Sequence, residues 1–383
     1  MSEPEPQATP APSAVRVSTL ELFFDLVFVF TLTQLTKAFA DRLDAVGAAR
    51  VLLMLGVIWW MYGGYAWLTN AIAPSSTTRR TLLLTGMVGF FTMALAVPDA
   101  FGRSGWVFGT AYLVVNLVHT GLFLHAEGAQ RAVRGLAPLN LTSAALVFAG
   151  GIATGPWRYG LWAAALVVQI VTPYLHSMAY AISPGHFVER HGLVVIVAIG
   201  ESIVAIGLGF EGVPVDLGVV VVAVLGLSIS YYLWWAYFAG DDEHAEHALS
   251  AITDPERRGR VALRGWAYAH FPMILGIVVL SAGVKKMVGH PFEPLDWAPA
   301  SALAGGVALF LLGHAWFLRI LGIPGVVHRV CAAVAVLLTI PLGALVAVAQ
   351  LAAVPVIMAT AMIIEDLPKV RRTGGTALHT FGR

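Results

Sequence analysis

Residues 21–30 read ELFFDLVFVF, and the interpretation of the whole chain depends on this stretch. Eight of its ten residues are apolar and four are Phe, yet Glu21 opens it and Asp25 lies inside it. Long apolar stretches recur at 48–68, 105–124, 159–175, 192–209, 215–239 and 329–364. Runs of about 18 or more such residues with few charges are typical of transmembrane helices. The sequence therefore predicts an all-α polytopic membrane protein.

The composition agrees with this prediction and excludes several other classes. Of 383 residues, 58% are hydrophobic and 12% are charged, against about 25% charged in soluble domains. The net charge of +1 gives no sign of a nucleic-acid partner. The single cysteine, Cys331, excludes a disulfide framework and a cysteine-based metal cluster.

The apolar stretches predict about twelve transmembrane helices separated by short connections. Residues 1–17 lack a basic segment and a cleavage site, so we expect a disordered cytosolic tail there. The predicted first membrane half covers 18–183 and the second 184–367, with 240–261 as a cytosolic linker and 368–383 as a basic cytosolic tail. The predicted spans are 19–39, 48–69, 80–98, 105–125, 135–154, 158–178, 187–209, 215–239, 262–284, 298–319, 329–347 and 350–366.

Short motifs suggest that the two halves are repeats. WWMY at 59–62 falls in the second span and WWAY at 234–237 in the eighth. An even number of spans in each half would make the repeats parallel, the 6+6 arrangement of one large class of secondary transporters. The alternative is that such short apolar motifs recur by chance.

Two carboxylates in the opening stretch have structural as well as functional explanations. Ser18-Thr19-Leu20-Glu21 fits a capping box. In such a box the Glu21 carboxylate accepts a hydrogen bond from the Ser18 backbone N–H, and the positive end of the helix dipole stabilises its charge. Asp25 lies one turn deeper on the same face, too far in to cap. An aspartate at this depth normally faces the bundle interior and has a partner. Either it binds a ligand, or it forms a structural ion pair with Arg190 or Arg264.

Glu201 is the strongest candidate for a functional carboxyl. It lies near the middle of the seventh span, with Ser202 and two glycines nearby and no Lys or Arg in its own helix after Arg190. Such a carboxyl is either protonated or paired with another helix. We expect it to handle a proton or a cation, the alternative being a hydrogen-bonded anchor.

Other polar residues are weaker candidates. His270 ranks first among the membrane histidines because Pro272 removes a helix hydrogen bond close to it. The segment DDEHAEH at 241–247 carries acids and histidines but no HExxH pattern, so it is interpreted as a solvated linker. No metal, cofactor or catalytic residue is predicted.

Three stretches together identify a family resemblance. VSTLELFFDLVFVF at 17–30, ERHGLVVIVAIGESIVAIG at 189–207 and YYLWWAYFAGDD at 231–242 resemble the bacterial low-temperature-requirement A (LtrA) family. The resemblance covers about residues 17–370 and implies a many-span inner-membrane protein linked by name to growth in the cold. It implies no reaction and no substrate. The hallmark acids of the family fall on Glu21, Asp25, Glu189, Glu201 and Asp241.

The sequence favours a secondary transporter or permease of an unknown small solute or ion, coupled to protons or cations. Its predicted site residues are Glu201, Asp25, Ser202, His270, Glu21 and Glu189. One alternative is a sensor or scaffold without chemistry, which the lack of a soluble domain disfavours. The main alternative is a membrane enzyme for a lipid or carrier-linked substrate, with a cluster at the cytoplasmic face formed by Glu21, Glu189, His186, His191, Asp241, Asp242 and His244.

The distribution of basic residues predicts that both termini are cytoplasmic. Twelve spans place 16 of the 23 Lys and Arg residues on the side of the N-terminus. Basic loops stay in the cytoplasm. A reporter fused to the C-terminus should therefore be fluorescent as green fluorescent protein and inactive as alkaline phosphatase. An active phosphatase fusion would contradict the predicted even number of spans. The seven residues on the other side are Lys37, Arg42, Arg50, Arg103, Arg158, Lys285 and Lys286.

Overall fold

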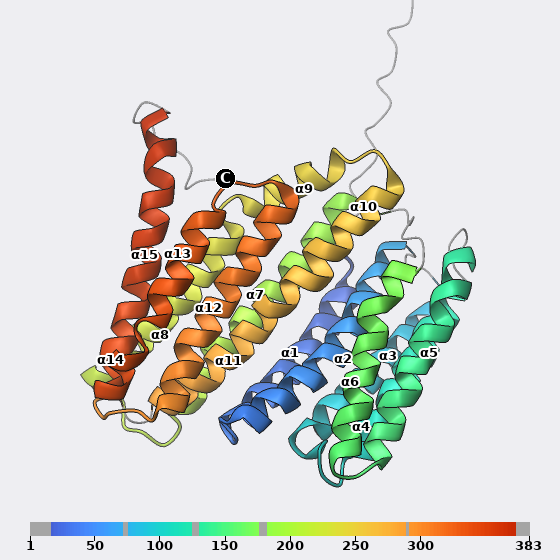
Figure 1. The fold of residues 1–383 in the computed structure, drawn as a ribbon, viewed down its shortest axis with the longest axis horizontal. Helices are drawn as coiled ribbons and strands as arrows, with labels where there is room; N and C mark the ends of the chain where they lie inside the picture. Colours follow the sequence, from blue (N-terminus) through green and yellow to red (C-terminus); the bar gives the residue numbers. More distant parts are fainter. Residues whose placement is uncertain (1–16, 72–75, 125–129, 176–181, 289–290, 373–383) are drawn as a thin grey trace, which may run out of the picture.

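The computed structural model describes residues 17–71, 76–124, 130–175, 182–288 and 291–372, and every regular element in these ranges is helical. The long helices form two bundles that lie side by side (Figure 1). The first bundle contains α1 (Thr19–Ala40), α2 (Ala45–Ala71), α3 (Thr77–Ala96), the short 3-10 helix η1 (Val97–Asp99), α4 (Gly105–Leu124), α5 (Gln130–Ile152) and α6 (Pro156–Leu175).

The second bundle has more irregular elements than the first. A π-helix interrupts one of its long helices, and a second predicted span is broken in two. Its elements are α7 (Pro184–Gly209), α8 (Leu217–Phe238), α9 (Asp241–Ser250), α10 (Pro255–Ala262), η2 (Leu263–Ala269), α11 (His270–Val288), α12 (Trp297–Leu321), α13 (Val326–Leu337), α14 (Ile340–Leu345) and α15 (Ala347–Arg372).

Within the described residues, each predicted span corresponds to helical structure. Among the described residues, eleven helices are long and apolar enough to cross a membrane. The predicted span outside this set is α6, whose apolar character is reduced by Arg158 and Gln169. Its 20 residues nevertheless cover about 30 Å at 1.5 Å per residue, and Figure 1 shows it running the height of the bundle beside α5.

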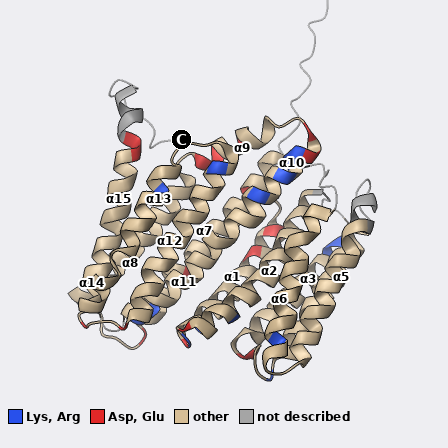
Figure 2. Ribbon diagram, in the orientation of Figure 1, with Lys and Arg blue, Asp and Glu red and all other residues tan. Residues whose placement is uncertain are grey.

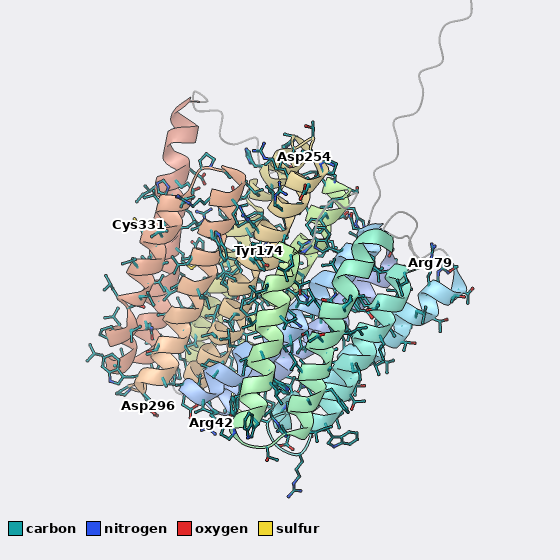
Figure 3. The ribbon with its side chains drawn as sticks, turned by 45° about the vertical axis from the view of Figure 1, so that its right-hand side comes forward. Arg42, Arg79, Tyr174, Asp254, Asp296 and Cys331 are labelled. Atoms are coloured by element: carbon teal, nitrogen blue, oxygen red, sulfur yellow. The ribbon has the colours of Figure 1, made fainter. Side chains whose placement is uncertain are left out.

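The ends of the bundles carry most of the charge. Figure 2 shows the Lys, Arg, Asp and Glu residues mainly near the two ends, with uncharged helices between them. Arg42 and Asp296 lie at one end, and Arg79 and Asp254 at the other (Figure 3). The start of α1 and the end of α15 lie at the same end (Figure 1), which agrees with an even number of crossings.

Two predicted boundaries differ from the structure. The predicted linker 240–261 is largely helical, since α9 and α10 occupy it and α10 continues through η2 into α11. The predicted span 329–347 is divided into α13 and α14, because Pro341 cannot donate a backbone hydrogen bond to the preceding turn. The terminal tails 1–16 and 373–383 lie outside the described residues. The 6+6 repeat stays a prediction.

Glycines allow α11 and α12 to approach closely. A Cβ atom added to Gly306 would lie 2.3 Å from the backbone nitrogen of Leu280 and 2.6 Å from the oxygen of Gly276. Gly276 in turn lies against the backbone of Phe310. Small residues at helix crossings allow this backbone contact, which replaces the hydrophobic effect as the source of packing energy inside a membrane. The α11–α12 pair therefore forms the tightly packed centre of the second bundle.

Substitutions at two adjacent glycines test this packing. Gly306→Ala should lower the melting temperature of the purified protein, because overpacking of this kind costs about 1–3 kcal/mol. Gly305→Ala is the matched control, since its Cβ would meet no atom within 4 Å and Ala is the better helix former. Equal melting temperatures for the two variants would contradict the close α11–α12 contact.

Candidate functional site

Helices α1 and α7 join the two bundles through a line of polar contacts, which we call the polar seam. It consists of the pairs Glu21–His186, Asp25–Arg190 and Thr33–Glu201. The first two pairs both connect residues 165 positions apart, and the third connects residues 168 apart. Because the separation in sequence is nearly constant, each step along α1 matches an equal step along α7. The two helices therefore run in the same direction and in register. The seam therefore follows the bundle interface from one end into the interior.

Glu21 caps α1 and also pairs across the interface. The Ser18 nitrogen donates to its Oε2 at 2.8 Å, and the Glu21 nitrogen donates to Ser18 Oγ at 3.4 Å, so the predicted capping box is confirmed. His186 Nε2 lies 3.4 Å from Glu21 Oε2, to which it is hydrogen bonded, and 3.3 Å from Oε1. The amide of Asn70 donates to His186 Nδ1 at 3.0 Å, which leaves Nε2 as the protonated nitrogen of a neutral ring. Glu21 thus accepts a hydrogen bond from His186 while it caps the helix.

Asp25 forms a buried ion pair. Arg190 Nη1 lies 3.0 Å from Asp25 Oδ2, and the Tyr62 hydroxyl donates to Oδ1 at 2.8 Å. Asp25 and Arg190 are each 1% exposed, and the guanidinium lies over the rings of Phe24 and Tyr62 at 5.7 and 5.8 Å. The prediction that Asp25 faces the bundle interior is confirmed, with Arg190 as the partner. The other predicted partner, Arg264, is exposed.

Glu201 meets hydroxyl groups of α1. Thr33 Oγ1 donates to Glu201 Oε2, and both residues lie on facing sides of α1 and α7. The Thr36 hydroxyl, one turn further along α1, lies near the same carboxyl but outside hydrogen-bond geometry. Glu201 is 1% exposed. At 1.5 Å per residue, Thr33 lies about 12 Å deeper along α1 than Asp25, so Glu201 is separated from the ion pair by apolar packing.

The remaining candidates lie apart from the seam. Ser202 faces α8, where its hydroxyl lies 2.8 Å from that of Ser230. His270 lies inside the second bundle, and Glu189 is exposed on α7. The sequence-predicted set is therefore divided: Glu21, Asp25 and Glu201 share the α1–α7 interface, and the other three residues do not.

His270 is held by the π-helix that precedes it. Its Nδ1 donates to the Gly265 carbonyl at 2.8 Å, a contact that spans five residues, and its Nε2 accepts the Tyr237 hydroxyl at 2.8 Å. The ring of His191 lies 5.9 Å away. Both ring nitrogens of His270 are thus satisfied within the second bundle. The sequence analysis singled out His270 because of Pro272, but the carbonyl that its ring bonds is that of Gly265 in η2.

The acids and histidines of the enzyme alternative do not form one cluster. Glu21 and His186 belong to the buried seam, Glu189 is exposed, and His191 lies next to His270. His244 bonds the Gly240 carbonyl of its own helix. Asp241 lies 3.5 Å from both His314 Nε2 and Arg329 Nη2, and Arg329 also pairs with Glu365. These residues form a chain of contacts through the protein interior: His270 lies beside His191 and bonds Tyr237, and the Tyr237 ring lies 5.8 Å from that of His314, which faces Asp241. Among the described residues, no group of three or more His, Cys, Asp or Glu residues is placed to hold a metal ion.

Thr33 and Thr36 were not singled out from the sequence, although the sequence contains the signal. Glu21, Asp25, Thr33 and Thr36 recur at intervals of four, eight and three residues. These intervals place all four on one stripe of a helix. Threonine is frequent in membrane helices, where its hydroxyl bonds the preceding turn. The stripe therefore becomes informative only together with the carboxyls that it contains.

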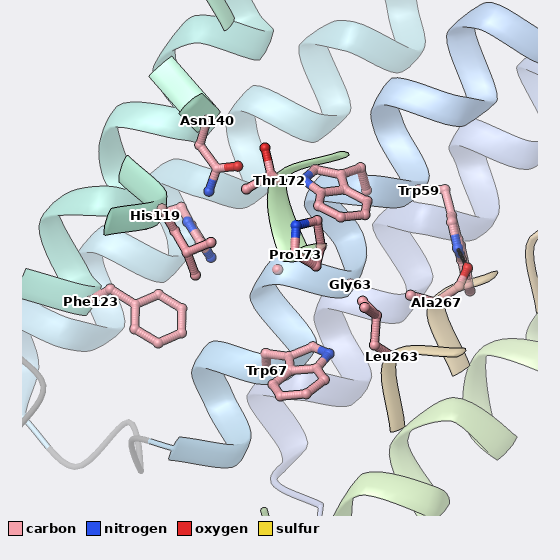
Figure 4. A pocket seen from close by; sticks show the side chains of 13 residues that line it. Trp59, Gly63, Trp67, His119, Phe123, Asn140, Thr172, Pro173, Leu263 and Ala267 are labelled. Carbon is pink, nitrogen blue, oxygen red and sulfur yellow. Dashed lines mark hydrogen bonds between the residues drawn. The ribbon is translucent and has the colours of Figure 1, made fainter. Parts of the chain in front are cut away.

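A cavity of about 100 Å³ lies between the bundles. Its walls come from α2, α4, α5 and α6 of the first bundle and from η2 of the second. Figure 4 shows His119, Asn140 and Thr172 on one side and Trp59, Leu263 and Ala267 on the other. His119 is buried, and its Nε2 makes no aligned hydrogen bond with a described residue. The described lining residues include no Asp, Glu, Lys or Arg.

Comparisons with known proteins agree with the resemblance seen in the sequence. A family model described as "Bacterial low temperature requirement A protein (LtrA)" matches residues 16–364. An uncharacterized protein of Rhizobium meliloti (strain 1021) is 28% identical over 326 residues, which cover 80% of this chain and 78% of that protein. The polar seam and the inter-bundle cavity both fall inside the matched region.

Stability measurements on the Asp25–Arg190 pair test the seam. Asp25→Leu should destabilise the protein by about 3–5 kcal/mol, because it leaves the Arg190 guanidinium buried without its counter-ion. The double variant Asp25→Leu/Arg190→Met should recover most of the lost melting temperature. Glu256→Leu is the control, since Glu256 pairs with Arg260 at the surface with both side chains about half exposed. Additive losses in the double variant would contradict a direct buried pair.

Proposed function

Because the chain belongs to the bacterial low temperature requirement A family and joins two helical bundles along a buried polar seam, we propose that it is a secondary transporter of a small solute in the cytoplasmic membrane. Glu201 couples transport to a proton or a cation. Alternating access would arise when one bundle rocks against the other, as in transporters built from two halves.

The contact of Glu201 with Thr33 is the observation that carries this proposal. A carboxyl in a membrane helix is costly unless it is neutral or paired. Its observed hydrogen-bond partner is an uncharged hydroxyl of the facing bundle. Loading with a proton or a cation would neutralise the carboxyl and favour the closed interface, whereas an unloaded carboxylate would favour separation and hydration. The charge state of Glu201 would thus be linked to the position of the two bundles.

The inter-bundle cavity is the proposed solute site. Residues from both bundles line it, so relative movement of the bundles would open or close it. Its walls combine the rings of Trp59, Trp60 and Trp67 with the polar side chains of His119 and Asn140. Without a charged group among the described lining residues, the cavity favours a small uncharged solute that has an apolar face and one or two hydrogen-bonding groups.

The membrane-enzyme alternative has less support. It requires a polar cluster open at one membrane face, where substrate and water could reach it. The acids and histidines proposed for that role do not converge on one cluster open at a membrane face, and Glu21, His186 and His191 are each at most 4% exposed. Buried groups of this kind are poorly placed for chemistry at the membrane surface.

Solute uptake by proteoliposomes tests the proposal. The purified protein would be reconstituted and given a mixture of small uncharged metabolites under an inward proton or sodium gradient. Accumulated solutes would be identified by mass spectrometry. Glu201→Gln should reduce gradient-driven accumulation at least tenfold, because the amide keeps the shape but cannot ionise. Glu189→Gln, at an exposed position on the same helix, should leave accumulation unchanged.

Two glycines provide a matched pair for the cavity. Gly63 lines the cavity and a Cβ atom there would meet no atom within 4 Å, so Gly63→Leu should fill the solute site and block uptake without unfolding the protein. Gly160→Leu is the control, because that glycine is equally open but lies at the surface of α6.

If no solute accumulates above empty liposomes, the transport proposal is contradicted. If Glu201→Gln accumulates solute as well as the wild type does, the coupling role of Glu201 is contradicted.

A further inference from the structure

We propose that Glu201, Thr33, Thr36 and Ser281 form a sodium-binding site at the junction of α1, α7 and α11. This inference rests on the proposed transport function and names its coupling ion. It depends on three observations: a buried carboxyl bonded to a threonine, two buried hydroxyls without partners, and a helix register that places those groups at one level.

The carboxyl and the α1 hydroxyls converge from two helices. Thr33 Oγ1 donates to Glu201 Oε2 and also lies 3.2 Å from the Val29 carbonyl. Thr36 is 2% exposed, and its hydroxyl lies close to the Glu201 carboxyl but outside hydrogen-bond geometry. Buried hydroxyls in proteins are nearly always bonded, so an unbonded one at a carboxyl indicates a missing ligand.

The third helix contributes a second unpartnered hydroxyl. Ser281 on α11 is fully buried, and its Oγ also has no partner among the described residues. The rings of His191 and His270 lie 5.9 Å apart, and a Cβ on Gly209 would lie 3.1 Å from Val288. Both contacts join residues 79 positions apart, so α7 and α11 also run parallel and in register.

This register places Ser281 at the same level of the membrane as Glu201. Adding this separation of 79 residues to position 201 gives residue 280, which is the neighbour of Ser281 in the sequence. Ser281 follows His270 by eleven residues and precedes Val288 by seven. Residues seven or eleven positions apart lie on nearly the same face of a helix. It therefore lies on the stripe of α11 that packs against α7. The site has one carboxylate and three hydroxyl groups.

The chemistry of these groups suits a hard monovalent cation. All the side-chain atoms are oxygens, which hard cations prefer, and the set contains neither thiol nor imidazole. A single carboxylate balances one positive charge. Lys285, one turn beyond Ser281 on α11, is the charged side chain that interacts electrostatically with Glu201. Within the described residues it forms no ion pair with Glu201. A bound sodium ion would satisfy the two free hydroxyls, which a proton on Glu201 would not.

Sodium binding can be measured without knowledge of the solute. The melting temperature of the full-length protein in detergent would be followed as sodium chloride replaces N-methyl-D-glucamine chloride at constant ionic strength. A ligand that binds the folded state raises the melting temperature with concentration. Binding of radioactive sodium to the immobilised protein gives the affinity directly. Potassium and lithium chloride, and a pH series, complete the comparison.

Three variants locate the site. Glu201→Gln should abolish the sodium-dependent rise, and Thr36→Val and Ser281→Ala should each weaken the apparent sodium affinity at least tenfold. Thr36→Val is the decisive variant, because valine has the shape of threonine, and removal of an unbonded buried hydroxyl alone would leave stability equal or higher. The control is Thr85→Val at an exposed threonine that bonds only its own helix, which should retain wild-type affinity.

Each outcome decides the proposal. A sodium-specific rise that Glu201→Gln abolishes and Thr36→Val weakens would support it. A melting temperature that does not distinguish sodium from N-methyl-D-glucamine would overturn it and assign Glu201 to protons, with the transport proposal intact. Sodium binding unchanged in Glu201→Gln and Thr36→Val would place the ion elsewhere. Sodium binding without uptake of any solute would contradict the transport function and leave the ion site standing.

Discussion

A charged side chain inside a membrane needs a partner, because lipid provides neither counter-ions nor hydrogen bonds. In this protein the requirement is met across the boundary between two helical bundles. Asp25 on α1 is held by Arg190 on α7 and by Tyr62 on α2, with all three side chains buried. The pair fixes the rotation of α1, since the face that carries Asp25 must turn toward α7. It also sets the register in which Glu21 meets His186 and Thr33 meets Glu201.

The polar contacts at the bundle interface differ in how costly they are to separate. The Asp25–Arg190 pair is charged, multiply bonded and sealed between aromatic rings. Opening that pair would expose two charges to lipid unless water entered. The contact of Glu201 with Thr33 involves a neutral hydroxyl, so it can be released when the carboxyl changes its charge state. The seam thus contains a permanent tie near one end and a group suited to switching deeper in the membrane. The proposed coupling role and the proposed sodium site both follow from this difference.

The interior of the second bundle has a different character. Glycines bring the backbones of α11 and α12 together, and His270 fills both of its hydrogen-bonding positions with Gly265 and Tyr237. Such packing leaves little freedom for movement within the bundle. The cavity, by contrast, lies where the first bundle meets η2. A rigid second bundle and a cavity at its border are consistent with movement of the bundles as bodies rather than with rearrangement inside them.

Hydropathy alone was enough to identify the membrane class and the approximate positions of the helices. A membrane span is a local property: about 20 apolar residues must lie together in the sequence to cover the hydrocarbon layer. The capping role of Glu21 was equally local, because both partners lie within one turn at Ser18. The interior position of Asp25 was also predictable, since a carboxylate cannot face lipid. The break at Pro341 and the π-helix η2 were not predicted, because local patterns do not show how the chain continues past a disturbed helix.

Only the tertiary structure decided which polar groups meet. Arg190 and Arg264 were equal candidates for Asp25, and the choice depends on which face of α7 or of the α10–η2 segment is turned toward α1. Ser202 is the neighbour of Glu201 in sequence, yet its side chain points about 100° away around the helix, toward Ser230 of α8. Thr36 and Ser281 drew no attention in sequence, because a hydroxyl in a membrane helix becomes informative only when its surroundings leave it without a partner. The sequence determined that this is a membrane bundle with internal carboxyls, and the packing of helices far apart in the chain decided their partners, because such contacts depend on rotation and register that no local pattern contains.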